Sequence, residues 1–278
     1  MTIILAKSAG FCWGVRRAVE TARKTANADG SGVFTDGPLI HNAHMMELLE
    51  ESGVRQRADP ATLPAGSTLI IRAHGIPPER RGELAKLPIK LVDATCPDVA
   101  RIQQVVRKHA EAGKTVIILG DHGHAEVVGL LGFAGARGKV VTSPQDVEAL
   151  PKDLGEVCLV SQSTQSEKLF EDTAAAVIRR HPGATIVNTI CNATRSRQRE
   201  LESLAAQCGM FVVVGSPASA NTQRLAQIAA GMRPTVVVDS ADELNRDDFA
   251  GVSTVAVTAG ASTPDFIIEQ VAARLAGF

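Results

Sequence analysis

Short apolar runs alternate along the chain with longer stretches in which apolar residues recur every three to four positions. Residues 2–8, 115–120 and 211–216 (TIILAKS, TVIILG and FVVVGS) are examples of the short runs, and each ends in small or polar residues. Runs of this length and composition predict buried parallel strands. The longer stretches, such as residues 15–22, have helical spacing. Strands that alternate with helices predict an α/β fold with parallel sheets.

One pattern occurs three times: an apolar strand, a short turn, a cysteine and a helix. The cysteines of the three copies are Cys12, Cys96 and Cys191. After each helix, further strands follow that end in polar clusters. The third copy lacks a strand-to-cysteine segment of its own, and the first residues of the chain are a segment of that type. We therefore expect three α/β units, formed by residues 13–95, 96–190 and 191–278, with residues 1–12 completing the third.

This repeat predicts a trefoil of three similar parallel-sheet α/β units with pseudo-threefold symmetry. Parallel sheets carry their functional groups at the carboxyl ends of the strands. Every cysteine of the repeat and every polar cluster follows a strand. We therefore expect all of them to face one common centre.

Composition excludes several classes of protein. Apolar residues make up 45% of the chain, charged residues 21%, and the formal net charge is -1, so nothing favours nucleic acid or an anionic membrane as partner. The N-terminal apolar run is too short for a secretory signal, and no run is long enough to span a bilayer, so we expect a cytoplasmic protein. Five widely separated cysteines without a CxxC pair favour neither a disulfide framework nor a zinc finger.

The five cysteines fall into two classes. Cys158 lies inside an apolar strand and Cys208 on the apolar face of a helix, so both are expected in the core. The three repeated cysteines instead lie at helix starts, where the helix dipole and free N–H groups favour the thiolate that binds metal. Each alone could be a structural thiol, but their recurrence favours ligands. Three thiolates without a fourth suit an iron–sulfur cluster with one open iron better than structural zinc.

Polar side chains at the strand ends predict a site for a small phosphorylated ligand. They offer imidazole, hydroxyl and amide groups beside helix N-termini, an arrangement that binds phosphate, and no nucleotide-binding glycine motif accompanies them. An alternative is that the hydroxyl residues are ordinary helix caps, as Thr164 with Glu167 would be in a capping box. Among the carboxylates we choose Glu126, two residues after His124, as the proton donor.

Nine motifs in chain order resemble one known family. They are GFCWGVRRA, IHN, RAHG, DATCP, GDHGHAEVVG, SQST, ICNATRSRQ, GSPASANTQRL and TAGASTPD. Together they cover essentially the whole chain and resemble the 4-hydroxy-3-methylbut-2-enyl diphosphate reductase (IspH/LytB) family. The resemblance implies a trefoil around a central 4Fe–4S cluster held by Cys12, Cys96 and Cys191.

The resemblance also implies an activity and its partners. It is the last step of the non-mevalonate (MEP) isoprenoid pathway, in which an allylic diphosphate loses its hydroxyl group by two-electron reduction and gives isopentenyl and dimethylallyl diphosphate. The electrons would come from ferredoxin or flavodoxin. Glu126 and Ser163, with His124, would handle the proton. The residues implied to hold the diphosphate are His41, His74, His124, Thr164, Ser219, Ala220, Asn221 and Ser262.

The chain departs from the family pattern at three places, which leave alternatives open. Ser163 stands where threonine is usual, Ala220 where a second serine is frequent, and residues 217–218 replace a more polar pair. One alternative is an iron–sulfur reductase or dehydratase acting on another substrate. Others are a non-catalytic iron–sulfur sensor and a cluster-free protein that binds a phosphorylated metabolite. For Trp13, the only tryptophan, we expect a place in the core.

Overall fold

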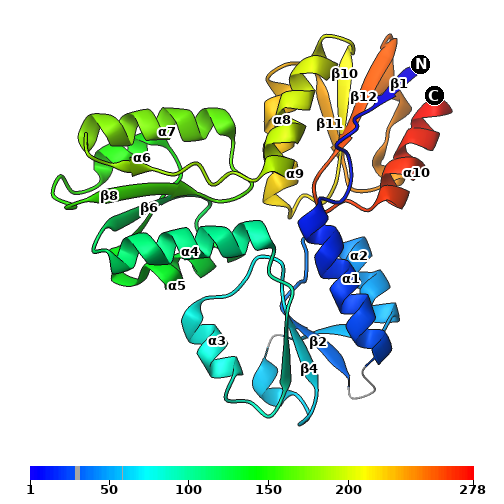
Figure 1. Cartoon of the computed structure of the whole chain (residues 1–278). Coiled ribbons are helices and arrows are strands. Elements are labelled where there is room, and N and C mark those ends of the chain that lie inside the picture. Colours follow the sequence, from blue (N-terminus) through cyan, green and yellow to red (C-terminus); the bar gives the residue numbers. More distant parts are fainter. Residues whose placement is uncertain (29–31, 58) are drawn as a thin grey trace. The chain divides into compact units, whose positions relative to one another are not determined.

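The computed structural model describes residues 1–28, 32–57 and 59–278. Within these residues the strands form three four-stranded sheets, and every strand pairing is parallel (Figure 1). The prediction of three parallel-sheet α/β units is confirmed. The described helices are α1 (Trp13–Ala28), α2 (Ala43–Glu51), α3 (Pro78–Leu84), α4 (Pro97–Glu111), α5 (Ala125–Ala134), α6 (Pro144–Ala149), α7 (Glu167–Arg180), α8 (Asn192–Ala205), α9 (Ala220–Ala230) and α10 (Asp265–Ala276).

The three sheets share one strand order. Sheet A runs β1 (Thr2–Leu5), β12 (Thr254–Ala259), β10 (Met210–Val214), β11 (Thr235–Val238). Sheet B runs β5 (Lys90–Asp93), β4 (Thr68–Ile71), β2 (Val33–Asp36), β3 (Val54–Arg57). Sheet C runs β9 (Thr185–Ile186), β8 (Val157–Ser161), β6 (Thr115–Leu119), β7 (Gly138–Val141). In each sheet an edge strand leads to one of the repeated cysteines.

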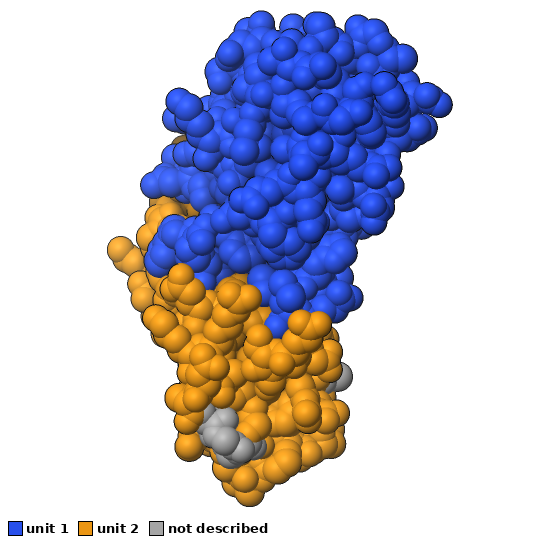
Figure 2. Space-filling view, turned by 90° about the vertical axis from the view of Figure 1, so that its right-hand side faces the viewer, with its two compact units in different colours: residues 1–16, 40–48, 192–278 blue, residues 17–39, 49–191 orange. Residues whose placement is uncertain are grey.

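By compactness the chain divides into two units. Unit 1 comprises residues 1–16, 40–48 and 192–278, and unit 2 comprises residues 17–39 and 49–191 (Figure 2). Unit 1 contains sheet A, and unit 2 contains sheets B and C. The division of the chain at residues 95/96 and 190/191, with residues 1–12 completing the third unit, remains a prediction.

The central strands of sheet A, β10 and β12, are buried on both faces, as their continuous apolar runs predict. Side chains alternate along β10, so Val212 and Val214 lie in one core cluster with residues of α10. Phe211 and Val213 lie in a second cluster with residues of α8 and α9. The N-terminal strand β1 joins this sheet by pairing with β12.

Sheet C of unit 2 has the same construction. Ile117 and Leu119 of β6 pack in a cluster with residues of α7, whereas Val116 and Ile118 pack in a cluster with residues of α4 and α5. Figure 1 shows these helices on the two faces of the sheet. In sheet B, Leu69 packs its buried side chain in a smaller cluster with Leu84 of α3.

No described helix combines the length and the apolar composition that a passage across a bilayer requires.

Candidate functional site

The three repeated cysteines share one backbone arrangement. The backbone N–H of Cys12 donates to the carbonyl of Ala261 at 3.1 Å, within unit 1. The N–H of Cys96 donates to Ala73 and that of Cys191 to Ser163, both at 2.9 Å and within unit 2. In each case the acceptor lies in the loop that follows the neighbouring strand of the same sheet. The three sheets therefore share both their strand order and the backbone hydrogen bond that positions the cysteine.

Each of these cysteines also lies where a helix begins. Cys96 is the N-cap of α4, which has Pro97 in its first turn, and Cys191 immediately precedes α8. The backbone N–H of Val15 donates to the sulfur of Cys12 at 3.4 Å, so the first turn of α1 faces a thiol or thiolate. All three side chains are half-buried, and none of the chain's five cysteines, all within the described residues, forms a disulfide.

Cys158 and Cys208 are core residues as predicted, but Cys208 does not lie on a helix, because α8 ends at Ala205. Both are buried among apolar residues, Cys158 in sheet C and Cys208 near sheet A. Burial raises the pKa of the Cys158 thiol to about 11 and also raises that of Cys208. These two thiols therefore stay protonated and serve as small core side chains.

Two arginines hold the loops before Cys96 and Cys12, and the sequence pattern alone did not identify either of them. In unit 2, Arg17 donates to the carbonyl of Thr95, the residue before Cys96, at 3.1 Å. In unit 1, Arg197 is 4% exposed and donates to the carbonyl of Gly10, two residues before Cys12. A signal was present in the sequence, because an arginine follows each repeated cysteine by five or six positions.

The loop before Cys12 explains Gly10 and corrects the prediction for Trp13. Gly10 has a φ of +97°, and a Cβ there would overlap a carboxylate oxygen of Asp265. Glycine is therefore required by the backbone and by the neighbouring carboxylate. Trp13 does not lie in the core, because its position at the first residue of α1 leaves it 54% exposed.

The acid proposed from the sequence is buried and tightly held in unit 2. Glu126 lies in the first turn of α5 and is 2% exposed. Its Oε1 accepts from the backbone N–H of Ser163 and its Oε2 from the Ser163 hydroxyl, both at 2.6 Å. Burial raises the pKa of Glu126 to about 7, although the two hydrogen bonds from Ser163 act to lower it. The carboxyl group is thus set to exchange a proton near neutral pH.

Ser163 connects this acid to a cysteine. Its amide and hydroxyl bind Glu126, while its carbonyl accepts from the N–H of Cys191. A single residue of the loop after β8 therefore contacts both the proposed acid, Glu126, and the proposed cluster ligand, Cys191.

Two of the three histidines predicted to bind the diphosphate, His74 and His124, lie together in unit 2. His124 is the N-cap of α5, and its Nδ1 accepts from the backbone N–H of Glu126 at 3.2 Å. Neutral His124 therefore carries its proton on Nε2. The ring of His74 meets that of His124 edge to face, with the ring centroids 5.5 Å apart.

Strand order separates these histidines into two types. His41 and His124 follow β2 and β6, which occupy corresponding places in sheets B and C. His74 follows β4, which corresponds to β8, so its counterpart is the segment with Thr164.

The capping alternative for Thr164 is wrong: α7 begins at Glu167 and its cap is Ser166, while Thr164 accepts from the side chain of Gln162 at 3.0 Å.

In unit 1 the remaining predicted residues form one polar group. Ser262 donates to the carbonyl of His41 at 3.2 Å, and its hydroxyl lies 3.4 Å from that of Ser219. Ser219 caps α9, whose first residues are Ala220 and Asn221.

The side-chain amide of Asn221 has a donor that no described residue accepts. The residue is buried, and its Nδ2 has no hydrogen-bond partner among the described residues. A buried amide of this kind beside a helix N-terminus fits an anion such as phosphate.

Asn42 is a further residue of the site that the sequence pattern alone did not identify. Its Oδ1 accepts from the N–H of Met45 at 2.9 Å and starts α2, as His124 and Ser219 start α5 and α9. The three loops after β2, β6 and β10 thus each end in a side-chain cap.

Comparison with known proteins points to one family. The family model described as "LytB protein" matches residues 3–276. A 4-hydroxy-3-methylbut-2-enyl diphosphate reductase of Opitutus terrae is 44% identical, over 99% of both chains. One of Aquifex aeolicus is 39% identical over 98% of this chain and 95% of its own.

Two solved structures are similar over nearly the whole chain. The E-1-hydroxy-2-methyl-but-2-enyl-4-diphosphate reductase of Plasmodium falciparum has a TM-score of 0.93 and 28% identity, covering 98% of this chain and 87% of its own. A second structure, described as (E)-4-hydroxy-3-methyl-but-2-enyl diphosphate reductase, the terminal enzyme of the non-mevalonate pathway, has a TM-score of 0.73 and 37% identity over the full length of both.

Proposed function

The chain belongs to the LytB protein family, and we propose that it catalyses the reaction for which its relatives are named. It reduces 4-hydroxy-3-methylbut-2-enyl diphosphate to isopentenyl and dimethylallyl diphosphate, the terminal step of the non-mevalonate pathway. Two electrons and two protons are consumed, the C–O bond of the allylic alcohol breaks, and the oxygen leaves as water. The observation that carries this proposal is the buried Glu126, bound through Ser163 to the loop of a repeated cysteine.

The donor set fits an iron–sulfur cluster. Cys12, Cys96 and Cys191 are half-buried, lie at helix starts and have one backbone arrangement, unlike the two core cysteines. We assign these three thiolates as ligands of a 4Fe–4S cluster, which leaves one iron without a protein ligand. When bound, such a cluster supplies electrons and a Lewis-acidic iron.

Glu126 supplies the proton for the leaving hydroxyl group. With a pKa of about 7, a large fraction of Glu126 is protonated at neutral pH. Its burial excludes water, so the proton passes to the substrate oxygen instead of to solvent. The Ser163 hydroxyl can donate to the carboxylate and accept from the carboxylic acid, so it can relay the proton from Glu126 to the substrate oxygen.

The diphosphate is held by donors from the strand ends. The Nε2 of neutral His124 and the unused amide of Asn221 are two of them. The complete proposed set is His41, His74, His124, Thr164, Ser219, the backbone of Ala220, Asn221 and Ser262. Electrons come from ferredoxin or flavodoxin, and the enzyme acts in the cytoplasm.

Anaerobic turnover tests this function. The purified protein is mixed with reduced methyl viologen and the allylic diphosphate, and viologen oxidation is followed. We expect two viologen radicals oxidised for each substrate, with both isomeric diphosphates as products. An iron-loaded protein that oxidises no viologen with this substrate would be a sensor or act on another compound.

A further inference from the structure

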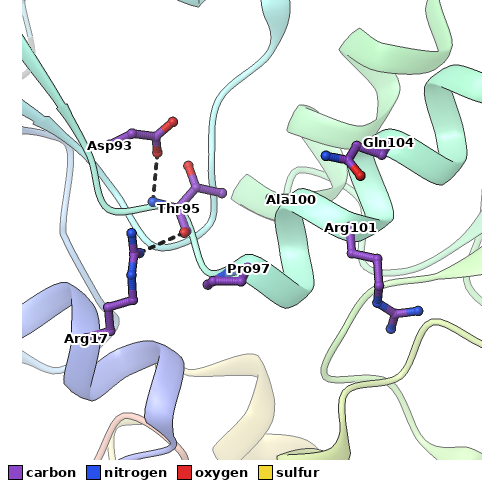
Figure 3. A pocket seen from close by; sticks show the side chains of 7 residues that line it. All are labelled: Arg17, Asp93, Thr95, Pro97, Ala100, Arg101 and Gln104. Carbon is purple, nitrogen blue, oxygen red and sulfur yellow. Dashed lines mark hydrogen bonds between the residues drawn. The ribbon is translucent and has the colours of Figure 1, made fainter.

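A surface pocket of unit 2 lies directly beside Cys96 (Figure 3). Its volume is about 430 Å³, and Arg17, Asp93, Thr95, Pro97, Ala100, Arg101 and Gln104 line it. Thr95 and Pro97 are the residues on either side of Cys96. The wall of the pocket is therefore separated from this proposed cluster ligand by one peptide bond.

The pocket carries an excess of positive charge. Arg17 and Arg101 lie on opposite sides of the segment with Thr95 and Pro97 (Figure 3). Asp93 is the one carboxylate of the lining, and Arg81 already forms an ion pair with it. Burial acts to raise the pKa of Asp93, but hydrogen bonds from Thr95 and Arg81 lower it by more. This carboxylate therefore stays ionised and paired.

One of the two guanidinium groups is unused. Arg17 is occupied with the Thr95 carbonyl, whereas Arg101 is exposed and forms no hydrogen bond or ion pair with any residue that the structure describes. Gln104 and Lys108 continue the exposed face of α4 beyond Arg101. Within the part of the chain that the structure describes, the side chains of Arg101, Gln104 and Lys108 form no hydrogen bond or ion pair.

We propose that this pocket is the docking surface for an acidic electron-transfer protein, which places a surface carboxylate against Arg101 and delivers electrons at the Cys96 segment. The inference rests on the proposed function, which requires two electrons per turnover. Each docking transfers one electron, so that the partner's redox group is oxidised and the enzyme reduced, and two dockings supply the pair. Complementary charges steer such encounters and raise their rate.

Kinetics with two kinds of donor test the proposal. A purified flavodoxin of net negative charge, kept reduced, is compared with reduced methyl viologen, a small dye that needs no docking surface. Arg101→Glu is expected to raise the KM for flavodoxin about tenfold at low salt and to weaken its salt dependence. Turnover with viologen should stay within about twofold of the native rate, because Arg101 takes no part in the site chemistry.

Two further variants control for general effects of charge. Gln104→Glu adds a negative charge to the same face and should raise the flavodoxin KM in the same direction. Arg55→Glu changes an exposed arginine of β3 in the same unit but outside the pocket. This variant should leave the KM for flavodoxin unchanged. Equal effects of Arg101→Glu and Arg55→Glu would overturn the proposal.

A binding titration separates this inference from the proposed function. Oxidised flavodoxin is titrated into the iron-loaded protein by calorimetry, which requires no turnover. Weaker binding to Arg101→Glu supports the docking surface even if the substrate proves to be different, and unchanged binding contradicts it. Inhibition by inorganic phosphate well beyond that by chloride at equal ionic strength would instead assign the pocket to a small anion.

Discussion

Both carboxylate oxygens of Glu126 accept hydrogen bonds from Ser163, one from its amide and one from its hydroxyl, each at 2.6 Å. The two residues are 37 positions apart in the chain. They meet because β6 and β8 are neighbouring parallel strands whose carboxyl ends lie at one edge of sheet C.

Replacing the acid with its amide should remove most activity. Glu126→Gln keeps the size of the side chain but has no proton to donate, and loss of a general acid lowers rates about 10²- to 10⁴-fold. Steady-state turnover with reduced viologen measures this, with iron content checked in parallel. An iron-loaded variant with full activity would remove Glu126 from the mechanism.

The pH profile should depend on the Ser163 hydroxyl. The hydrogen bond from this hydroxyl acts to lower the pKa of Glu126, so Ser163→Ala should raise that pKa further. The limb of the pH–rate profile that reports the protonated acid should move to higher pH. Ser163→Thr restores the hydroxyl and should restore the native profile, whereas an alanine variant with an unshifted limb would show that the hydroxyl does not contact the acid.

The free energy of unfolding should fall as pH rises, because the buried carboxyl group of Glu126 loses its proton. Burial raises the pKa of Glu126 from its ordinary value of 4.5 to about 7, so the folded state binds the proton more tightly than the unfolded state. Its contribution is complete below the unfolded pKa and is lost as pH rises through the folded pKa, an effect on the order of 3 kcal/mol. Urea unfolding at acidic and alkaline pH should show a smaller pH dependence for Glu126→Gln than for the native chain. Equal dependence in both would exclude Glu126 as its source.

The cysteines should divide into two classes in iron binding. Serine at Cys12, Cys96 or Cys191 removes one thiolate ligand and should lower the iron bound per chain. Cys208→Ser, a change in the core away from the helix starts, should retain iron and is the matched control. The exposed Trp13 next to Cys12 provides a second readout, because its fluorescence should be quenched when iron binds. Full iron content in all three variants would contradict the ligand assignment.

Much of the fold could be predicted because the periodicity of this sequence is strong. The apolar runs identify strands, and the repeat around the cysteines identifies one arrangement that occurs three times. The contact between Glu126 and Ser163 was accessible for the same reason, since both follow neighbouring strands.

Other features depend on contacts that no local pattern encodes. The bond from Arg197 to Gly10 joins residues 187 positions apart, and an arginine in a polar helix is typical of an exposed surface. The cap of α7 was misplaced because neighbouring hydroxyl residues, Thr164 and Ser166, are both able to cap a helix. Trp13 was expected in the core from its residue type, but its place at the start of α1 leaves it exposed.

In the proposed function, three cysteines from distant parts of the chain hold the redox group of a reductase. Iron and acid-labile sulfide measured in protein purified without oxygen test it most directly. We expect a brown protein with about four irons and four sulfides per chain, as a 4Fe–4S cluster requires. A colourless, correctly folded protein that takes up neither iron nor sulfide would contradict it.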